Sequence, residues 1–234
     1  MRISVKKILF GVVICALGTL GSVADANPDD MASQMHAHLV TATAARDAVI
    51  HGDLDAVHKA GAALAAVPMS DQMPEAWRPM LAETKDIAER LAVTKDLQTA
   101  SGLVGEITLT CANCHTATGG GPKIEEVPQQ KWDSTSQMPL HKWSADWMWI
   151  GLISGNEAAW KRGGQELVDA KLAPRFEDVE PSEGLMQLEQ LVGIVGTMAA
   201  EQTLDEAERA RLYGQFVGVC AQCHLKVKAL GMKK

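Results

Sequence analysis

The sequence predicts an all-α fold made of two tandem units, each resembling a four-helix bundle. Aromatic residues make up only 4% of the 234 residues, and no segment alternates between polar and apolar side chains as a half-exposed strand would. Five landmarks of the first half, among them Met35 and His38, recur 103 positions later, where the matching pair is Met138 and His141. This constant displacement indicates an internal duplication, so we expect two copies of one helical unit.

Proline and glycine set the expected helix boundaries in the first unit. Gly52 ends the first helix, Pro68 follows the second, and three glycines from Gly119 onward end the fourth. The expected helices are residues 28–50, 53–66, 74–91 and 94–115. The polar, proline-containing stretch that follows is the expected linker between the units.

The second unit repeats the same order of elements. Its expected helices are residues 139–154, 156–172, 181–200 and 204–228. Thr203 and Glu206 have the spacing of a capping box at the start of the last helix. The predicted organisation is a secretory signal at 1–26, a first unit at 27–122, a linker at 123–137 and a second unit at 138–234.

The most specific pattern in the chain is the pentapeptide Cys-x-x-Cys-His, which occurs twice. Its residues are Cys111, Cys114 and His115, and then Cys220, Cys223 and His224, displaced by 109 positions. This spacing is typical of covalent c-type haem, in which two thiols add to the porphyrin vinyl groups and the histidine ligates the iron. A zinc site would need four ligands, and a redox dithiol does not require the following histidine. The sequence therefore predicts two covalent haem c groups.

A second ligand for each iron is expected at the start of the first helix of each unit. In an antiparallel bundle, the end of helix four lies beside the start of helix one, and His38 and His141 are there. Outside the pentapeptide, His141 is the only histidine of the second unit. We therefore expect bis-histidine ligation, with His38 opposite His115 and His141 opposite His224.

Two alternatives for the sixth ligand of each iron remain open. Met35 and Met138 precede the two histidines by about one helical turn and are alternative ligands, which would raise the reduction potential. In the third arrangement the sixth position is vacant. His36, His51 and His58 are interpreted as solvated side chains, and the tryptophans of the second unit as packing residues.

Residues 1–26 have the features of a secretory signal. A basic start precedes a short apolar core from Ile8 to Leu20, and residues 24–26 (Ala-Asp-Ala) fit a small-x-small cleavage site. The apolar core is too short for a convincing membrane span. We expect export to the periplasm, cleavage after about Ala26 and no membrane span afterwards. Cleavage would also remove Cys15 and leave no thiol beyond those of the pentapeptides.

The charge of the chain bears on its partners. The whole chain has 22 basic and 29 acidic side chains, and 19 basic and 28 acidic ones remain without residues 1–26. This acidic balance argues against nucleic acid and acidic membrane surfaces as partners. It favours redox partner proteins that have a basic docking surface.

On these residues the chain resembles a bacterial dihaem c-type cytochrome. Each half is similar to the four-helix-bundle cytochromes of the cytochrome c′ class (class II), in which the Cys-x-x-Cys-His motif lies on the last helix. The resemblance implies that the residues of both pentapeptides hold haem c. Typical cytochromes c′ have one haem per chain and no histidine facing the sixth position. The presence of His38 and His141 therefore puts the gas-binding behaviour of that class in doubt here.

The expected function is electron transfer between redox partners rather than enzymatic catalysis. Two irons with filled coordination would relay single electrons with little rearrangement, and no convincing hydrolytic constellation is visible. The alternative is a gas-binding protein or a dihaem peroxidase, which needs an open haem site. A peroxidase of this kind would need two haem sites with different roles, and the near-equivalence of the two halves argues against that.

Overall fold

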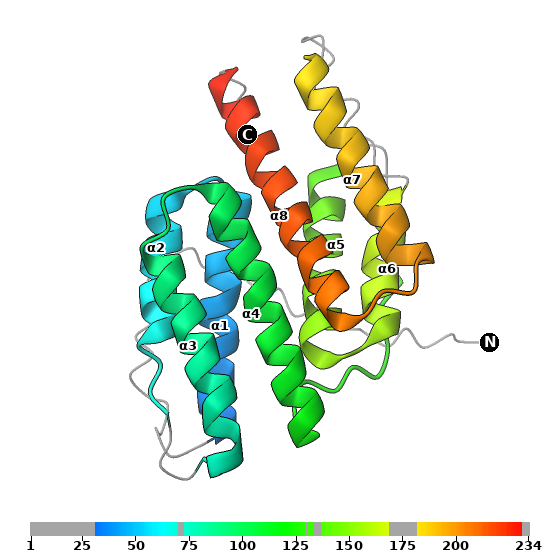
Figure 1. Ribbon diagram of the computed structural model, residues 1–234. Coiled ribbons are helices and arrows are strands. Elements are labelled where there is room, and N and C mark those ends of the chain that lie inside the picture. Colours follow the sequence, from blue (N-terminus) through cyan, green and yellow to red (C-terminus); the bar gives the residue numbers. More distant parts are fainter. Residues whose placement is uncertain (1–30, 70–72, 130, 133–136, 169–181, 231–234) are drawn as a thin grey trace, which may run out of the picture.

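The computed structural model describes residues 31–69, 73–129, 131–132, 137–168 and 182–230. Within these ranges every regular element is a helix (Figure 1), which confirms the predicted all-α fold. The expected signal segment and part of the expected linker lie outside the described residues. None of the helices in the described ranges combines the length and the apolar character that crossing a bilayer requires.

The first half contains four α-helices, as the sequence predicts. They are α1 (Met31–Ile50), α2 (Leu54–Ala65), α3 (Arg78–Ala92) and α4 (Leu97–Thr118). The helix expected from Pro74 is divided, because a short 3-10 helix, η2 (Glu75–Trp77), precedes α3. Pro79 lies in the first turn of α3, where its missing N–H has no intrahelical partner to lose, so the regular helix begins at Arg78.

Side-chain caps and glycines define the ends of these helices. Asp53 caps α2 and Asp96 caps α4, each accepting a hydrogen bond from the amide three residues later, at 2.9 and 2.7 Å. The fourth helix, α4, extends beyond its predicted end at His115 to Thr118. It stops at Gly119, whose φ of +65° is a left-handed conformation that favours glycine.

The second half repeats this order. Its helices are α5 (Gln137–Ser154), α6 (Glu157–Val168), α7 (Glu183–Glu201) and α8 (Glu206–Ala229). The predicted capping box of Thr203 and Glu206 is wrong. The box is formed by Asp205 and Glu208, each accepting a hydrogen bond from the other's amide at 2.8 and 2.9 Å. An aspartate at the N-cap is a better acceptor for the orphan amides than a threonine two residues earlier.

Consecutive helices pack side by side in each half, with α1–α4 on one side of the molecule and α5–α8 on the other (Figure 1). In the centre, α4 lies against α8, and the two helices run in opposite directions. Their C-terminal ends, which contain the two pentapeptides, therefore lie at opposite ends of the molecule.

Small residues allow α4 and α8 to cross closely. A Cβ on Gly105 would lie 2.6 Å from the backbone oxygen of Ala210, and one on Gly214 would lie 2.8 Å from that of Ser101. Both distances are too short for a real Cβ contact, so only glycine fits at these positions. Gly105 and Gly214 are 109 positions apart, as are Ser101 and Ala210. The crossing therefore contains two equivalent contacts, Gly105 with Ala210 and Gly214 with Ser101.

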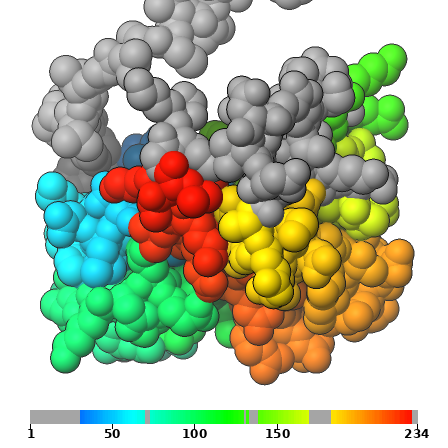
Figure 2. Space-filling view, turned by 90° about the horizontal axis from the view of Figure 1, so that it is seen from above, coloured from blue at the N-terminus to red at the C-terminus, as the bar shows by residue number. Residues whose placement is uncertain are grey.

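Most of the buried apolar side chains of both halves belong to one cluster, which includes Val49, Ile107, Met148 and Phe216. The end of α8 also reaches the first half, because a Cβ on Gly52 would lie 3.0 Å from the side chain of Leu225. Seen from above in Figure 2, this end of α8 lies between the α2 region and α7. The shared core holds the two halves against each other.

Candidate functional site

Helical spacing brings the three motif residues of each pentapeptide together. Residues at i, i+3 and i+4 are neighbours on a helix surface, so Cys111, Cys114 and His115 occupy one patch of α4. The second pentapeptide occupies the same place on α8. His115 and His224 each lie ten residues beyond a crossing glycine, which separates them by about 30 Å along the helix axes. The structure thus contains two candidate sites at a distance from each other.

A cavity of about 420 Å³ lies beside the first pentapeptide. It is formed by the start of α1, η2, the start of α3, the end of α4 and the glycine-rich segment after α4. Its lining is mostly apolar and includes Met35, Leu39, Trp77, Leu81, Cys114 and His115. The end of helix four and the start of helix one therefore meet here, as the antiparallel bundle predicts. An apolar cavity bordered by a thiol and an imidazole fits a covalently attached porphyrin.

The imidazole of His115 is held by a residue of the other half. Its Nδ1 contacts the backbone oxygen of Ile153 at the end of α5. A carbonyl oxygen only accepts hydrogen bonds, so Nδ1 is the protonated nitrogen and Nε2 has the lone pair. Metal-ligating histidines are usually oriented in this way, through a hydrogen bond from the nitrogen that does not bind the metal. The donor set of the first site thus fits a haem iron.

Gly121 lies against the same imidazole. A Cβ on Gly121 would lie only 2.7 Å from Cγ of His115 and 2.8 Å from its Nδ1. The φ of Gly121 is +93°, which side chains rarely adopt. This glycine therefore allows the chain to turn closely against the ring.

All four cysteines of the pentapeptides are free thiols in the described chain. Burial, with a smaller contribution from the neighbouring cysteine of each pair, raises the pKa of Cys111 and of Cys220 to about 12. Burial also raises the pKa of Cys114 and of Cys223. The four sulfur atoms are thus protonated and partly buried, so they are available for thioether bonds inside the fold.

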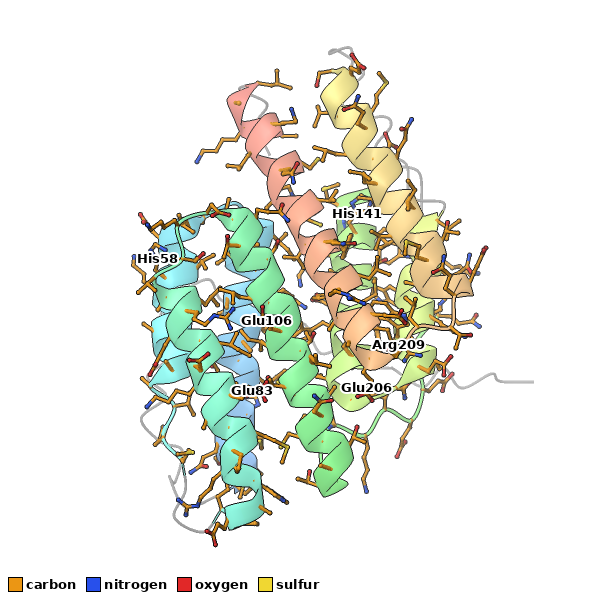
Figure 3. All side chains as sticks on the ribbon, viewed as in Figure 1. His58, Glu83, Glu106, His141, Glu206 and Arg209 are labelled. Atoms are coloured by element: carbon orange, nitrogen blue, oxygen red, sulfur yellow. The ribbon has the colours of Figure 1, made fainter. Side chains whose placement is uncertain are left out.

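The second site brings His141 close to its pentapeptide. Figure 3 shows His141 on α5 next to α8. Its Nε2 is buried and has no hydrogen-bond partner in the part of the chain that the structure describes. Burial, together with the nearby charge of His224, lowers the pKa of His141 to about 4. A buried, neutral imidazole with an unsatisfied nitrogen is costly unless it binds something, so His141 fits a metal ligand.

At the first site, Met35 lines the cavity beside His115. The expected ligand His38 lies about one turn further along α1, on a stripe with the buried Ala42 and Ala45, and is not among the residues that line this cavity. Burial lowers the pKa of His38, so this imidazole is also neutral. In the second half, the alternative ligand Met138 is half-buried in the first turn of α5. Of the two methionines, Met35 is the one that lines the described cavity.

The structure changes the interpretation of the three remaining histidines. His36 is exposed but lines the first cavity. His51 is also exposed, and its ring centroid lies 5.6 Å from that of His224, with an angle of 34° between the rings. His58 is half-buried, and its Nε2 forms a 2.7 Å hydrogen bond with the backbone oxygen of Thr94. Solvated side chains were expected at all three positions, and His58 instead connects α2 to the segment before α4.

Sequence reasoning missed the contribution of each half to the site of the other. Ile153 contacts the histidine of the first pentapeptide, and His51 approaches that of the second. Ile50 and Ile153 are matching landmarks of the repeat, which was the available signal. The described residues contain no cluster of three or more His, Cys, Asp or Glu side chains suited to a free metal ion.

Comparisons of the chain with known protein families, with curated proteins and with solved structures found no match. The resemblance to dihaem cytochromes therefore rests on the two pentapeptides and on the geometry around them.

Proposed function

We propose that this protein is a periplasmic dihaem c-type cytochrome that transfers single electrons between redox partner proteins. The observation that carries the proposal is the hydrogen-bond orientation of His115, whose Nδ1 contacts a backbone oxygen and leaves Nε2 for iron. The pentapeptide places two free thiols on the same helical patch. These are the donor types that covalent haem c requires.

Each half would hold one haem through its own pentapeptide. Thioether bonds would form at Cys111 and Cys114 in the first half, with His115 as the proximal ligand. Cys220, Cys223 and His224 would do the same in the second. The bound haem would supply a one-electron couple, and the protein would orient its ligands and exclude water from it. The shared apolar core supports this role, since rigid surroundings limit rearrangement during electron transfer.

We further propose that the two halves are tandem copies of one four-helix-bundle-like unit. The close crossing supports this division, because Gly105 with Ala210 and Gly214 with Ser101 are matching contacts. A duplicated unit that packs about an approximate two-fold axis repeats each contact with the two halves exchanged, as here.

Histidines complete both irons in this proposal, His141 at the second site and His38 at the first. The buried Nε2 of His141 and its closeness to His224 support the first assignment. At the first site Met35 is the alternative, because it lines the cavity beside His115. Filled coordination on both irons favours electron transfer over binding of a substrate or gas.

The alternative function is a gas-binding protein or a dihaem peroxidase with an open haem site. The cavity of about 420 Å³ beside the first pentapeptide is the observation that favours it, because a small molecule would have space there. The lining is mostly apolar, whereas O–O cleavage needs polar groups that assist it. Apart from the two pentapeptide residues, the lining side chains with polar atoms are His36, Thr118 and the indole of Trp77.

The mass of the exported protein tests the proposal. The full chain would be produced with the bacterial machinery that attaches haem c, purified from the periplasm and weighed under denaturing conditions. We expect the mass of the chain without its first 26 residues plus two haems. The double variant Cys111→Ser, Cys114→Ser should lose one haem and keep the other. A wild-type mass without any haem increment would exclude the proposed function.

A further inference from the structure

The end of α1 places a histidine beside the second pentapeptide, and the proposed function gives this histidine no role. The ring centroid of His51 lies 5.6 Å from that of His224, and the two rings are inclined by 34°. His51 belongs to the first half and His224 to the second, so this contact crosses the interface between the halves. A side chain of one copy therefore lies against the proposed proximal ligand of the other.

The backbone around His51 fixes the place of its ring. Nδ1 of His51 lies 2.7 Å from the backbone oxygen of Asp47. A carbonyl oxygen only accepts hydrogen bonds, so Nδ1 donates, and the ring is tied to the last turn of α1. Gly52 follows with a φ of +70°, and its amide donates a 2.9 Å hydrogen bond to the backbone oxygen of Val49. This turn closes the helix directly after His51.

The matching helix end of the second half has the same turn and a different side chain. Gly155 has a φ of +64°, and its amide donates a 3.1 Å hydrogen bond to the backbone oxygen of Leu152. Ser154 lies 103 positions after His51 and takes its place in the repeat. The hydroxyl of Ser154 donates a 2.6 Å hydrogen bond to the backbone oxygen of Ile150 in its own helix. At the matching position the first site therefore has a hydroxyl that bonds within its own helix, and not an imidazole ring.

The repeat also indicates the side from which His51 approaches the second site. Ile153 contacts Nδ1 of His115 through its backbone oxygen. Its match in the first half is Ile50, which directly precedes His51. The repeat therefore indicates that His51 lies on the Nδ1 side of His224, away from the nitrogen that would bind iron.

We propose that His51 is a positioning residue for the second haem, whose ring holds the plane of the His224 imidazole by packing against it. The inference rests on the proposed function. Neighbours of a ligating histidine usually fix the orientation of its ring and tune the metal without touching it. The repeat supplies this ring to the second site and a serine to the first. The two haems thus differ in their surroundings although their pentapeptides match.

Electron paramagnetic resonance of the oxidised dihaem protein tests the inference, because the g values of a low-spin haem depend on the orientation of its axial imidazole planes. His51→Ser introduces the residue of the matching helix end, and His51 is exposed, so the fold should be kept. We expect the largest g value of the second-site signal to shift and its line to broaden, with the first-site signal unchanged. The reason is that a ring without this contact adopts a wider range of orientations.

Two further variants make the test specific. His51→Phe keeps a flat ring at the same place and should restore a narrow second-site line near its original position. His58→Ser is the matched control, because it removes a histidine whose ring bonds to the backbone oxygen of Thr94, and it should leave both signals in place. The signals are assigned in the Cys111→Ser, Cys114→Ser background, in which only the second haem is expected.

The outcomes separate this inference from the proposed function. A wild-type protein that lacks covalent haem would exclude both. If both haems are present and His51→Ser leaves the second-site signal unchanged, or alters both signals equally, the inference alone is wrong. A high-spin second-site signal in His51→Ser would also overturn it, because His51 would then be an axial ligand. Equal effects of His51→Phe and His51→Ser would exclude ring packing as the means of positioning.

Discussion

Gly121 lies so close to the imidazole of His115 that a Cβ at this glycine would be 2.7 Å from Cγ of the ring. We predict that Gly121→Ala displaces the imidazole and weakens the first haem site, with loss of its low-spin signal or of its haem. Gly119→Ala is a matched control, because Gly119 has a φ of +65° and a Cβ there would meet nothing within 4 Å. Alanine at a positive φ costs about 1–2 kcal/mol in both variants, and only Gly121→Ala also disturbs the ring of His115.

The prediction is checked by measuring the haem content and the electron paramagnetic resonance spectrum of both glycine variants. If Gly119→Ala and Gly121→Ala behaved alike, the backbone cost alone would explain the result, and the close contact with His115 would have no consequence for the site.

A second prediction concerns the histidines opposite the pentapeptides. His141→Ala should convert one of two low-spin signals into a high-spin signal and allow carbon monoxide to bind there, because the iron loses its sixth ligand. His38→Ala should do the same for the other signal. His58→Ala is the control, since His58 bonds to Thr94 and should leave both signals intact. Two unchanged low-spin signals in His38→Ala would show that His38 is not the ligand and would favour Met35 in its place.

The pH dependence of the second site follows from the burial of His141. Burial and the nearby His224 lower the pKa of His141 to about 4, from an ordinary value of 6.5. The neutral imidazole, which is the form that binds iron, therefore persists as the pH falls from 7 toward 4. We expect the second-site haem to remain low-spin down to about pH 4 in an optical acid titration. A transition near pH 6.5 would show that a solvated histidine, and not a buried one, is being protonated.

The sequence predicted that the start of the first helix lies near the end of the fourth in each half, but Met35 and His36, and not the expected His38, line the cavity beside His115. Once the pentapeptide is placed on the fourth helix of an antiparallel bundle, the start of the first helix must lie beside it. The cavity between Met35 and His115, and the closeness of His141 to His224, agree with this prediction. Local patterns suffice here because short connections leave few ways to pack four helices.

The contacts between the halves could not be predicted in the same way. A repeat shows which residues match and does not show which faces of the two copies meet. The contact of Ile153 with His115 therefore became visible only in the structure. Arg46 illustrates the same limit, since an arginine in a helix is usually solvated and its burial depends on Asp146, 100 positions away. Small residues spaced four apart, such as Ser101 and Gly105, were an available signal for the close crossing.

A final prediction concerns this crossing. A Cβ on Gly105 would lie 2.6 Å from the backbone oxygen of Ala210, so Gly105→Ala must push α4 and α8 apart. We expect a loss of about 1–3 kcal/mol in the free energy of unfolding, as for other overpacked contacts. Gly102→Ala is the matched control on the same helix, because a Cβ there would meet nothing within 4 Å. Relief of the glycine penalty should make this control more stable by about 0.5–1 kcal/mol. Urea unfolding of the two variants measures both effects, and opposite signs are expected because one glycine lies in the contact and the other faces open space. If both variants were stabilised, the two helices would not approach each other as closely as this packing requires.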